Sequence, residues 1–367
     1  MGKGSPDREN LELWIQRKTM GEAFRMRYEF WAGSYGTKEE ETIARFSLDT
    51  ETGQMEKIYG CSGAENPSWI CLNRAKTVLY SVEELSPQGR ILAFGVGEQG
   101  LEPLASLSTG GADPCHICLD EGERYLLAAN YTSGSLAVFG LDGEGIPVRE
   151  TDFIRHSGRG RDPVRQEGPH VHFSCVAGER AYVVDLGTDL VSVYGLEGET
   201  GRLLETGEAL RLPAGAGPRH LAFHPHIPGL LYVACELDSS VALFREKDGA
   251  YLPEGRVSAL PEGFAGENTA AAIRIRRDRL FVSNRGHDSI AAFSMGEDGG
   301  LRLCQTIPTG GRTPRDFAFM GEYMAVANQG SDEITVLRMD PETGKLERTG
   351  ISAPMSRPTC ICPVPPQ

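Results

Sequence analysis

The chain has 367 residues, 40% of them hydrophobic, and a formal net charge of −14 at pH 7. Such a charge repels nucleic-acid phosphates and anionic membranes, so we expect neither as a partner. No apolar run approaches the roughly 20 residues that cross a bilayer, and the N-terminus shows no apolar region typical of a signal peptide. The sequence therefore predicts a cytoplasmic protein.

The first segment, residues 1–27, fits none of the patterns that follow it. Its few apolar residues are scattered among mixed charges, and chain termini are often poorly ordered. We expect a short helix or a disordered extension here, outside the main domain.

From residue 28 onwards the chain repeats itself. Seven stretches share a proline, or an asparagine in the fifth stretch, followed by mostly apolar residues three and five places later. We call these first residues the anchors, and they are Pro67, Pro114, Pro169, Pro218, Asn268, Pro314 and Pro358. Successive anchors are 44 to 55 residues apart. This period is typical of a β-propeller when each unit holds four short strands.

Each unit does contain four predicted strands. The anchor stretch is followed by strands such as LLAAN and SLAVFGL and by a looser segment such as GRLLETG, and their alternation favours strands. Residues 28–58 supply three strands without a first one, whereas the C-terminal RPTCICPV is a first strand without successors. Joining them leaves no open sheet edge. The prediction is one all-β domain over residues 28–367, a seven-bladed β-propeller of four-stranded antiparallel blades, closed by the N-terminal strands plus the C-terminal strand.

Nine cysteines raise the question of a metal site or a disulfide framework. Cys71, Cys118 and Cys362 stand where other repeats carry alanine, so they fit the role of small packing residues. Cys115 and Cys118 are three residues apart on a predicted strand and would point to opposite faces. We expect free thiols, no metal site and no cofactor.

Polar residues that interrupt the repeat mark a candidate site. The residue after each anchor and the polar residue that ends the next strand should meet near the axis, at one mouth of the ring. At these two positions, or next to them, the sequence has His170, His172, Asp185, Arg219, His220, Glu236, Arg285 and Arg315. Histidine, arginine and carboxylate groups converging on an axial pocket suit acid–base chemistry on an anionic substrate. The alternative is that they only hydrogen-bond the channel walls.

The longest interval between anchors contains the insertion RHSGRGRDPVRQEG, just before His170. It carries Arg155, Arg159, Arg161 and Arg165 in an otherwise acidic protein. A solvated surface loop is one interpretation. Because guanidinium groups bind carboxylates and phosphates well, we favour a lid that guides an anion to the site.

Three sets of motifs resemble the lactonase family of seven-bladed propellers: RQEGPHVH with VVDLGTDLVSVY, GPRHLAFHP with CELDSSV, and FVSNRG. That family includes bacterial propeller-type 6-phosphogluconolactonases and fungal carboxymuconate lactonizing enzymes. The resemblance covers about residues 28 to 363, and the sequence departs from the family pattern at the fifth anchor and in the N-terminal tail. Matched motif by motif, it implies a catalytic site of His170, Arg219, Glu236 and Arg285, with His172 beside it.

The resemblance implies hydrolysis of a sugar lactone, foremost 6-phospho-D-glucono-1,5-lactone to 6-phosphogluconate, a reaction of the pentose phosphate pathway type. Opening the ester needs an activated water and a stabilised oxyanion, and the chain has no GxSxG nucleophile motif. We expect Glu236 or His170 to deprotonate water and Arg219 to stabilise the oxyanion. Arg285, with Arg315 or a lid arginine, would hold the phosphate. The expected substrate-binding residues are His172, His220, Asp185 and Arg315.

Two other functions fit the same residues. A carboxy-cis,cis-muconate cycloisomerase would transfer a proton to carbon while arginines hold the carboxylates. A non-catalytic propeller would use its axial charges to bind a ligand or a protein. A metal site of His170, His172 and His220 is the weakest alternative. As a partner we expect a small anionic lactone, with the protein a monomer or a weak homo-oligomer.

Overall fold

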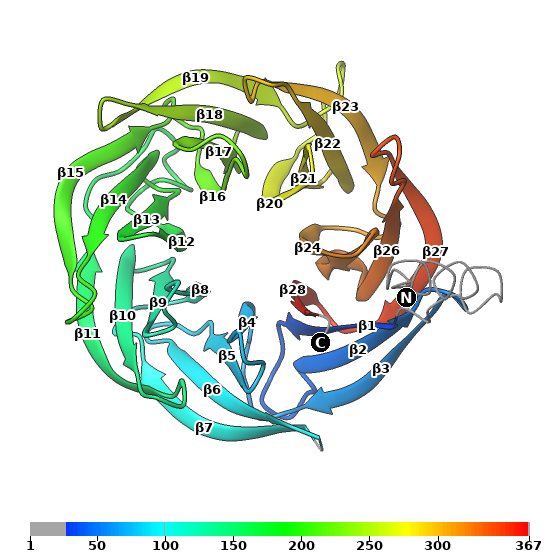
Figure 1. Cartoon of the computed structure of the whole chain (residues 1–367), viewed down its shortest axis with the longest axis horizontal. Helices are drawn as coiled ribbons and strands as arrows, with labels where there is room; N and C mark the ends of the chain where they lie inside the picture. The colour runs from blue at the N-terminus through cyan, green and yellow to red at the C-terminus, as the bar shows by residue number, and fades with distance from the viewer. Residues whose placement is uncertain (1–26, 99, 366–367) are drawn as a thin grey trace, which may run out of the picture.

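The computed structural model describes residues 27–98 and 100–365. Within these residues the chain forms twenty-eight β-strands and one 3-10 helix of three residues, and the strands make seven four-stranded sheets around a central axis (Figure 1). The predicted all-β, seven-bladed propeller is confirmed. Residues 1–26, most of the predicted extension, lie outside the described residues, and Arg27 already belongs to the first strand.

We number the blades 1 to 7 around the ring and give the strands of each from the axis outwards. Blades 1 to 3 are β28 (Pro358–Val364), β1 (Arg27–Ser34), β2 (Ile43–Asp49), β3 (Gln54–Cys61); β4 (Ile70–Leu72), β5 (Val78–Glu83), β6 (Arg90–Gly97), β7 (Gly100–Ser108); and β8 (Pro114–Leu119), β9 (Tyr125–Asn130), β10 (Ser135–Leu141), β11 (Pro147–Arg155). Blades 4 and 5 are β12 (Val171–Ala177), β13 (Arg180–Asp185), β14 (Leu190–Leu196), β15 (Leu203–Arg211); and β16 (Pro218–Phe223), β17 (Leu230–Cys235), β18 (Ser240–Lys247), β19 (Ala250–Ser258). Blades 6 and 7 are β20 (Thr269–Arg276), β21 (Arg279–Arg285), β22 (Ser289–Met295), β23 (Leu301–Pro308); and β24 (Pro314–Met320), β25 (Tyr323–Asn328), β26 (Glu333–Met339), β27 (Leu346–Pro354), with the 3-10 helix η1 (Gln329–Ser331) after β25.

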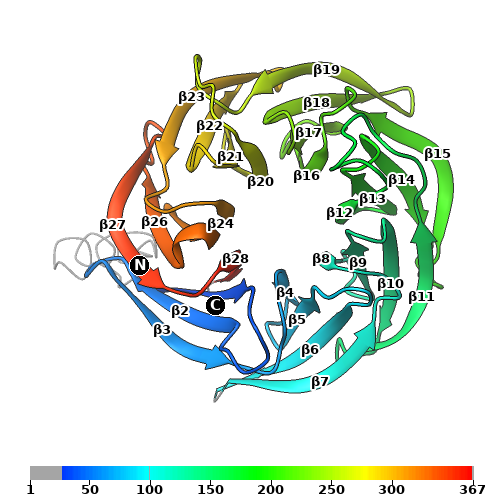
Figure 2. The same cartoon turned by 180° about the vertical axis from the view of Figure 1, so that it is seen from behind.

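The two ends of the chain close the ring. Strand β1 pairs with β28 in antiparallel register, so that Trp31 lies opposite Cys362 and Phe30 opposite Pro363. Figure 2 shows the described ends side by side in blade 1, with the first strand of every blade lining the central opening. The predicted closure by N-terminal strands and the C-terminal strand is therefore confirmed.

The hydrophobic core lies between neighbouring blades, in seven clusters that each bridge one pair. Between blades 1 and 7, for example, Phe30 and Phe46 stack with ring centroids 5.3 Å apart and pack against Ile334. Fully burying such a side chain stabilises the fold by about 1.5–3 kcal/mol. These interfaces hold the seven innermost strands, and hence the side chains at their ends, in fixed positions.

In every blade except blade 2 the innermost strand begins with a β-bulge. In blades 3, 5 and 7 the residue after the anchor proline is extra in the pairing, and these residues are Cys115, Arg219 and Arg315. A bulge re-aims the extra side chain, and bulges are common beside active sites. The repeated bulge therefore turns the residue after the anchor out of the regular strand alternation.

Blade 4 departs from the predicted register. Here Val171, and not the predicted anchor Pro169, pairs with the end of the second strand, at Asp185. In blade 6 the same place belongs to Ala270, opposite Asn284, and not to Asn268. Both predicted anchors were thus wrong by two residues, because in these repeats the anchor signal stands in the incoming loop. Consequently His172, and not His170, occupies the bulged position that Arg219 has in blade 5.

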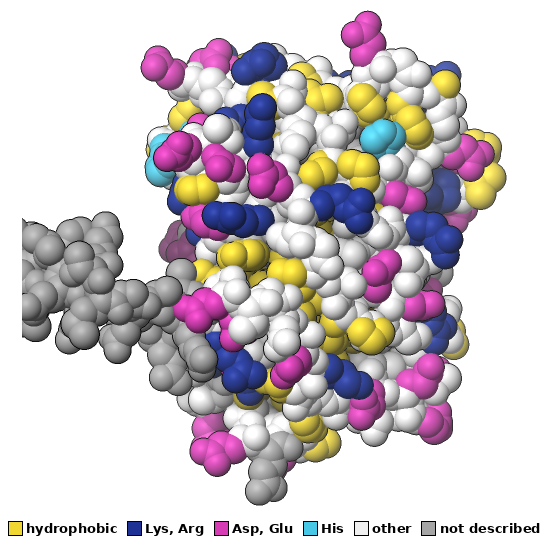
Figure 3. Space-filling view, turned by 90° about the vertical axis from the view of Figure 1, so that its right-hand side faces the viewer, with side chains coloured by type: hydrophobic (Ala, Val, Ile, Leu, Met, Phe, Trp, Pro, Cys, Tyr) yellow, Lys and Arg dark blue, Asp and Glu magenta, His cyan; other side chains and the backbone are white. Residues whose placement is uncertain are grey.

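Within the described residues, no helix is long and apolar enough to cross a membrane. The outer wall seen in Figure 3 mixes acidic and basic side chains, with hydrophobic side chains scattered between them. On this face the acidic excess of the sequence does not gather into one patch.

Candidate active site

One ring position defines the mouth of the central channel. In six blades the residue just after the second strand donates its backbone N–H to a backbone carbonyl, with N···O distances of 2.6 to 3.1 Å. Except in blade 2, that carbonyl belongs to the residue just before the first paired residue of the innermost strand. These residues are Tyr35, Glu84, Tyr131, Leu186, Glu236 and Gln329, and Arg285 has the equivalent place in blade 6. Because the position is the same in every blade, these side chains surround one mouth. The acidic, basic and phenolic side chains among them come from blades 1, 2, 3, 5 and 6.

Glu236 binds three arginines at this mouth. Its Oε2 lies 2.7 Å from Arg285 Nη2 and 3.1 Å from Arg219 Nε, and its Oε1 lies 2.6 Å from Arg165 Nη2. The side chains of Glu236 and Arg219 are only 4% and 3% exposed, whereas that of Arg165 is 39% exposed. A buried carboxylate therefore gathers guanidinium groups from blade 5, blade 6 and the inserted loop.

The cluster keeps its charges at neutral pH. Burial alone would raise the pKa of Glu236, but Arg285 and Arg219 outweigh it and hold that pKa well below the usual range of a glutamate. Burial, Arg285 and Arg315 lower the pKa of Arg219 to about 9. The carboxylate is therefore ionised and the guanidinium is still a cation at pH 7. Three arginines on one carboxylate leave local positive charge that an anion can neutralise.

The inserted loop is fastened over the mouth. Gln166 is fully buried; its Oε1 accepts the amides of Arg161 and Asp162 at 2.9 and 3.0 Å. Its Nε2 donates to Leu186 O and Asp189 Oδ1, both at 2.8 Å. The neighbouring Arg165 is thereby held where it reaches Glu236. Four hydrogen bonds of Gln166 thus anchor the predicted lid next to this arginine.

His170 lies on the rim, just before β12. Its ring stacks on Tyr131 at 4.5 Å, and its Nδ1 lies 3.1 Å from the carbonyl oxygen of Tyr131. Since a carbonyl only accepts, this contact assigns the hydrogen to Nδ1 and leaves Nε2 as the nitrogen that can take a proton. Nε2 lies 3.3 Å from a carboxylate oxygen of Glu167, an exposed residue of the inserted loop.

His172 lies deeper in the channel, with its ring 5.6 Å from Tyr131 and 5.4 Å from His220. Its Nδ1 is buried and has no hydrogen-bond partner. Burial, with Arg219, lowers the pKa of His172 well below its ordinary value, so the imidazole is neutral. An unpaired buried nitrogen beside a charged cluster is costly in a structural site and marks a place where a ligand can bind.

Below these histidines, aromatic rings fill the channel. His116 lies between Trp69 and Phe173, with centroids 4.4 and 4.2 Å away, and His220 touches Phe173 at 4.9 Å. His220 Nε2 lies 3.2 Å from Arg219 Nη1. His220 therefore supports Arg219 from below and is itself only 1% exposed.

Asp185 does not face the arginine cluster. Its Oδ1 accepts the amides of His170, Gly187 and Thr188 at 2.8 to 3.2 Å, and its Oδ2 lies 2.8 Å from His156 Nδ1. The carboxylate is fully buried. Asp185 thus fixes the backbone of His170, and its geometry fits a positioning residue better than the substrate contact expected from the sequence.

The other side of the mouth holds a second carboxylate, Glu84. Tyr35 Oη donates to its two oxygens at 2.9 and 3.0 Å, and Ser68 Oγ also donates to it. Arg315 Nη2 donates to Tyr35 Oη at 2.9 Å. Burial raises the pKa of Glu84, although Arg315 opposes this. Arg315 thus contacts Tyr35 on the Glu84 side of the mouth, and it also acts electrostatically on Arg219 and Arg285.

Comparison with known proteins identifies the family. Residues 29–363 match the family described as "Lactonase, 7-bladed beta-propeller". The chain belongs to the lactonase family. It is 33% identical to a Bacillus subtilis protein named 6-phosphogluconolactonase over 346 residues, which are 91% of this chain and 98% of the relative. The family resemblance and the prediction of a lactonase enzyme are thereby confirmed.

Solved structures agree with this assignment. A Lactobacillus plantarum protein superposes on the lactonase with a TM-score of 0.87 and 32% identity, covering 93% of this chain and 100% of the other. The Pseudomonas aeruginosa periplasmic gluconolactonase superposes with a TM-score of 0.86 and 27% identity, covering 93% and 99%.

The structure brings most of the predicted site residues of the lactonase together. Contacts join Glu236 with Arg219 and Arg285, and a chain of ring contacts joins His170, His172 and His220 to them through Tyr131 and Arg165. Sequence reasoning missed Tyr35, Glu84 and Tyr131. It took the last residue of the second strand as the axial one, whereas the residue after it faces the mouth. The strand-ending Asn130, Asn284 and Asn328 are buried and hydrogen-bond inside the blade walls.

No group of three histidine, cysteine or acidic side chains among the described residues of the lactonase is placed to hold a metal ion. The nine cysteines, all of which are described, are free thiols. The arrangement of His170, His172 and His220 is a string of ring contacts through Tyr131 and not a convergence of nitrogens on one point.

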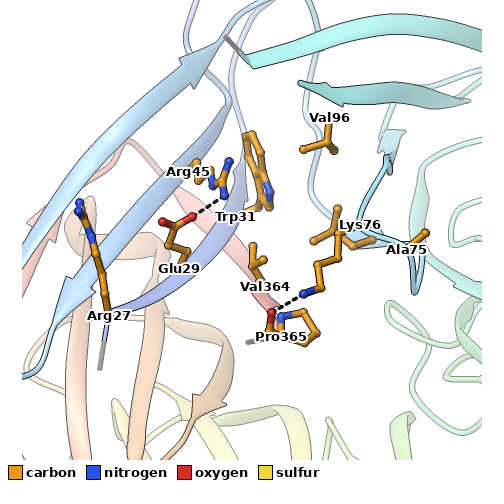
Figure 4. A pocket seen from close by; sticks show the side chains of 10 residues that line it. Arg27, Glu29, Trp31, Arg45, Ala75, Lys76, Val96, Val364 and Pro365 are labelled. Atoms are coloured by element: carbon orange, nitrogen blue, oxygen red, sulfur yellow. Dashed lines mark hydrogen bonds and ion pairs between the residues drawn. The ribbon is translucent and has the colours of Figure 1, made fainter. Parts of the chain in front are cut away.

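Two hollows lie at the opposite end of the ring from the mouth. One of about 690 Å³ opens at the far end of the channel and is lined by residues that include Trp69 and Arg274. The other, of about 640 Å³, lies between blades 1 and 2, and Figure 4 shows that its Arg45 pairs with Glu29 and its Lys76 with a backbone carbonyl. Neither is lined by the predicted site residues of the lactonase.

Proposed function

We propose that this lactonase hydrolyses an anionic sugar δ-lactone, with 6-phospho-D-glucono-1,5-lactone as its substrate. The observation that carries this proposal is the charge of the mouth. Four arginines, Arg165, Arg219, Arg285 and Arg315, stand with three carboxylates, Glu84, Glu167 and Glu236, which leaves an excess of one positive charge in a protein of net charge −14. Such a site attracts and holds an anion. The Bacillus subtilis relative named 6-phosphogluconolactonase supports the choice of lactone.

The Glu236 cluster would supply the electrostatic part of catalysis. When water attacks the lactone carbonyl, negative charge develops on the carbonyl oxygen. Arg219 is buried and prearranged by Glu236 and His220, so it can stabilise that oxyanion without reorganising. One well-placed donor is worth roughly 3–4 kcal/mol of barrier. Arg285 and the partly exposed Arg165 would bind the phosphate.

For the proton acceptor we propose His170 over Glu236. A carboxylate that binds three guanidinium groups is a weak base, because protonating it breaks the cluster. His170 has Nδ1 committed to a carbonyl, and its Nε2 lies at the rim, 3.3 Å from the exposed carboxylate of Glu167, whose place the attacking water would take. The imidazole would take a proton from the attacking water and return it to the ring oxygen as the C–O bond breaks. Glu167 would stabilise the imidazolium between these steps.

A carboxymuconate cycloisomerase remains the comparison function, since the same arginines would bind carboxylates. The test measures wild-type turnover of 6-phospho-D-glucono-1,5-lactone, D-glucono-1,5-lactone and a carboxy-cis,cis-muconate, each corrected for the spontaneous rate. We expect kcat/KM to be highest for the phosphorylated lactone. Turnover of the muconate, with no acceleration of either lactone, would contradict the proposal.

A further inference from the structure

The two sides of the mouth differ in charge. On one side three arginines share Glu236, so a positive excess remains. On the other side Glu84 stands with one arginine, Arg315, so the charges balance. Both sides lie on the same rim, because Glu84 and Glu236 occupy equivalent places in blades 2 and 5. A ligand that spans the mouth thus meets an anion-binding side and a neutral polar side.

The neutral side has hydrogen-bonding capacity left over. Glu84 offers about four acceptor positions on its two oxygens, of which the described contacts from Tyr35 and Ser68 use part. The phenol of Tyr35 donates to Glu84 and accepts from Arg315, which leaves one lone pair. Arg315 has five N–H groups, and one is donated to Tyr35. Acceptors and donors therefore stand side by side, at a site that is partly open to the channel.

This pattern fits sugar hydroxyls. A hydroxyl group donates one hydrogen bond and accepts others, so two neighbouring hydroxyls match a carboxylate placed beside a guanidinium. We propose that this side of the mouth binds the hydroxyl groups of the sugar ring, through a subsite of Tyr35, Ser68, Glu84 and Arg315. The subsite rests on the proposed function, which places the lactone in this mouth.

The carboxylate also sets what the subsite rejects. A second anionic group placed here would lie beside Glu84 and be repelled when that carboxylate is ionised. The substrate therefore carries its anionic group on the Glu236 side only. A polyhydroxylated lactone with one phosphate meets this condition, whereas a molecule with carboxylates at both ends does not.

The test compares D-glucono-1,5-lactone with δ-valerolactone, which has the same ring without hydroxyl groups. The variant Tyr35→Phe removes one hydroxyl contact and keeps the ring over Arg315. We expect the ratio of kcat/KM values, gluconolactone over valerolactone, to fall about tenfold, as for the loss of one hydrogen bond. Tyr323→Phe, on β25 away from the mouth, is the matched control and should leave the ratio unchanged. An unchanged ratio in Tyr35→Phe would overturn the subsite.

A binding measurement separates this inference from the proposed function. If the wild-type protein accelerates hydrolysis of none of these lactones, 6-phospho-D-glucono-1,5-lactone included, the proposed function fails, and titration calorimetry with D-gluconate and 5-hydroxypentanoate decides about the subsite. Weaker binding of D-gluconate alone to Tyr35→Phe supports it. Equal losses for both ligands, or none, would overturn it.

Discussion

Arg165 Nη2 lies 2.6 Å from Glu236 Oε1, although the two residues are 71 positions apart in the chain. The same guanidinium donates to Tyr131 Oη at 3.2 Å. One arginine of the inserted loop thus joins blade 3 to blade 5 across the mouth. It is the most exposed of the three arginines bound to Glu236, which suits a group that meets the substrate first.

Arg165→Ala should weaken binding of the anionic substrate more than catalysis. We expect KM for the phosphorylated lactone to rise about 10- to 100-fold, since a charge-assisted hydrogen bond contributes about 1.5–3 kcal/mol. For unphosphorylated gluconolactone the change should be smaller. Arg165→Lys should lie between, because lysine keeps the charge but loses the planar fork. Steady-state kinetics on both lactones measure this.

The control for that variant is Arg159→Ala, which removes an exposed arginine from the same loop. Its KM should stay within about twofold of the wild-type value, as for most surface substitutions. If Arg159→Ala and Arg165→Ala raise KM equally, the loop acts through its overall charge and the specific role of Arg165 is wrong.

Gln166→Ala should loosen the inserted loop. The substitution removes four hydrogen bonds from a fully buried side chain and leaves Leu186 O and Asp189 without one partner each. We expect trypsin to cleave after the loop arginines at least about tenfold faster, because cleavage follows the open population. Gln305→Ala, which removes two bonds between blades 6 and 7, is the matched control. Loop cleavage that is as fast in the control as in Gln166→Ala would contradict the role of Gln166.

His116→Phe should reduce the loss of stability in acid. Burial, with Arg274 and Arg219, holds the pKa of His116 well below its ordinary value, so the folded protein keeps it neutral. The unfolded chain protonates this histidine below about pH 6.5. Stability is therefore present above pH 6.5 and falls as the pH drops, by about 1.4 kcal/mol per pH unit for one histidine. Phenylalanine keeps an aromatic ring next to Trp69 and Phe173 and cannot take the proton.

The measurement is urea unfolding of wild type and His116→Phe between pH 7 and pH 5. The slope of the unfolding free energy against pH should be shallower in the variant by about one proton. His172 and His220, whose pKa values are lowered in the same way, keep the remaining slope in both proteins. Parallel pH dependences would show that His116 titrates normally in the folded state.

The fold was predictable because its signals are local. Strand alternation, turn residues and a period of 44 to 55 residues repeat seven times, so a misassigned strand in one unit is corrected by the others. The incomplete units at the two ends predicted the closure between β1 and β28, which the pairing of Trp31 with Cys362 confirms.

The site was predictable in part. Glu236, Arg219 and Arg285 could be picked because they break the repeat, and the structure joins them. The bulges at the start of the innermost strands in blades 4 and 5 could not be read from alternation. His170 was therefore matched to Arg219, although His172 is the residue in the equivalent position. Tyr131 lies one residue past a strand end and is aromatic, so it resembled a packing residue.

The central claim is that the Glu236 cluster and His170 form the catalytic site. Its most direct test is kcat/KM on 6-phospho-D-glucono-1,5-lactone, above the spontaneous rate, for wild type, Glu236→Gln, His170→Gln and Arg159→Ala over pH 5 to 8. Glu236 stays ionised across this range and Arg219 stays protonated. The account predicts losses of about 100-fold or more in the first two variants and a wild-type rate in Arg159→Ala. Wild-type kinetics in both Glu236→Gln and His170→Gln would contradict it.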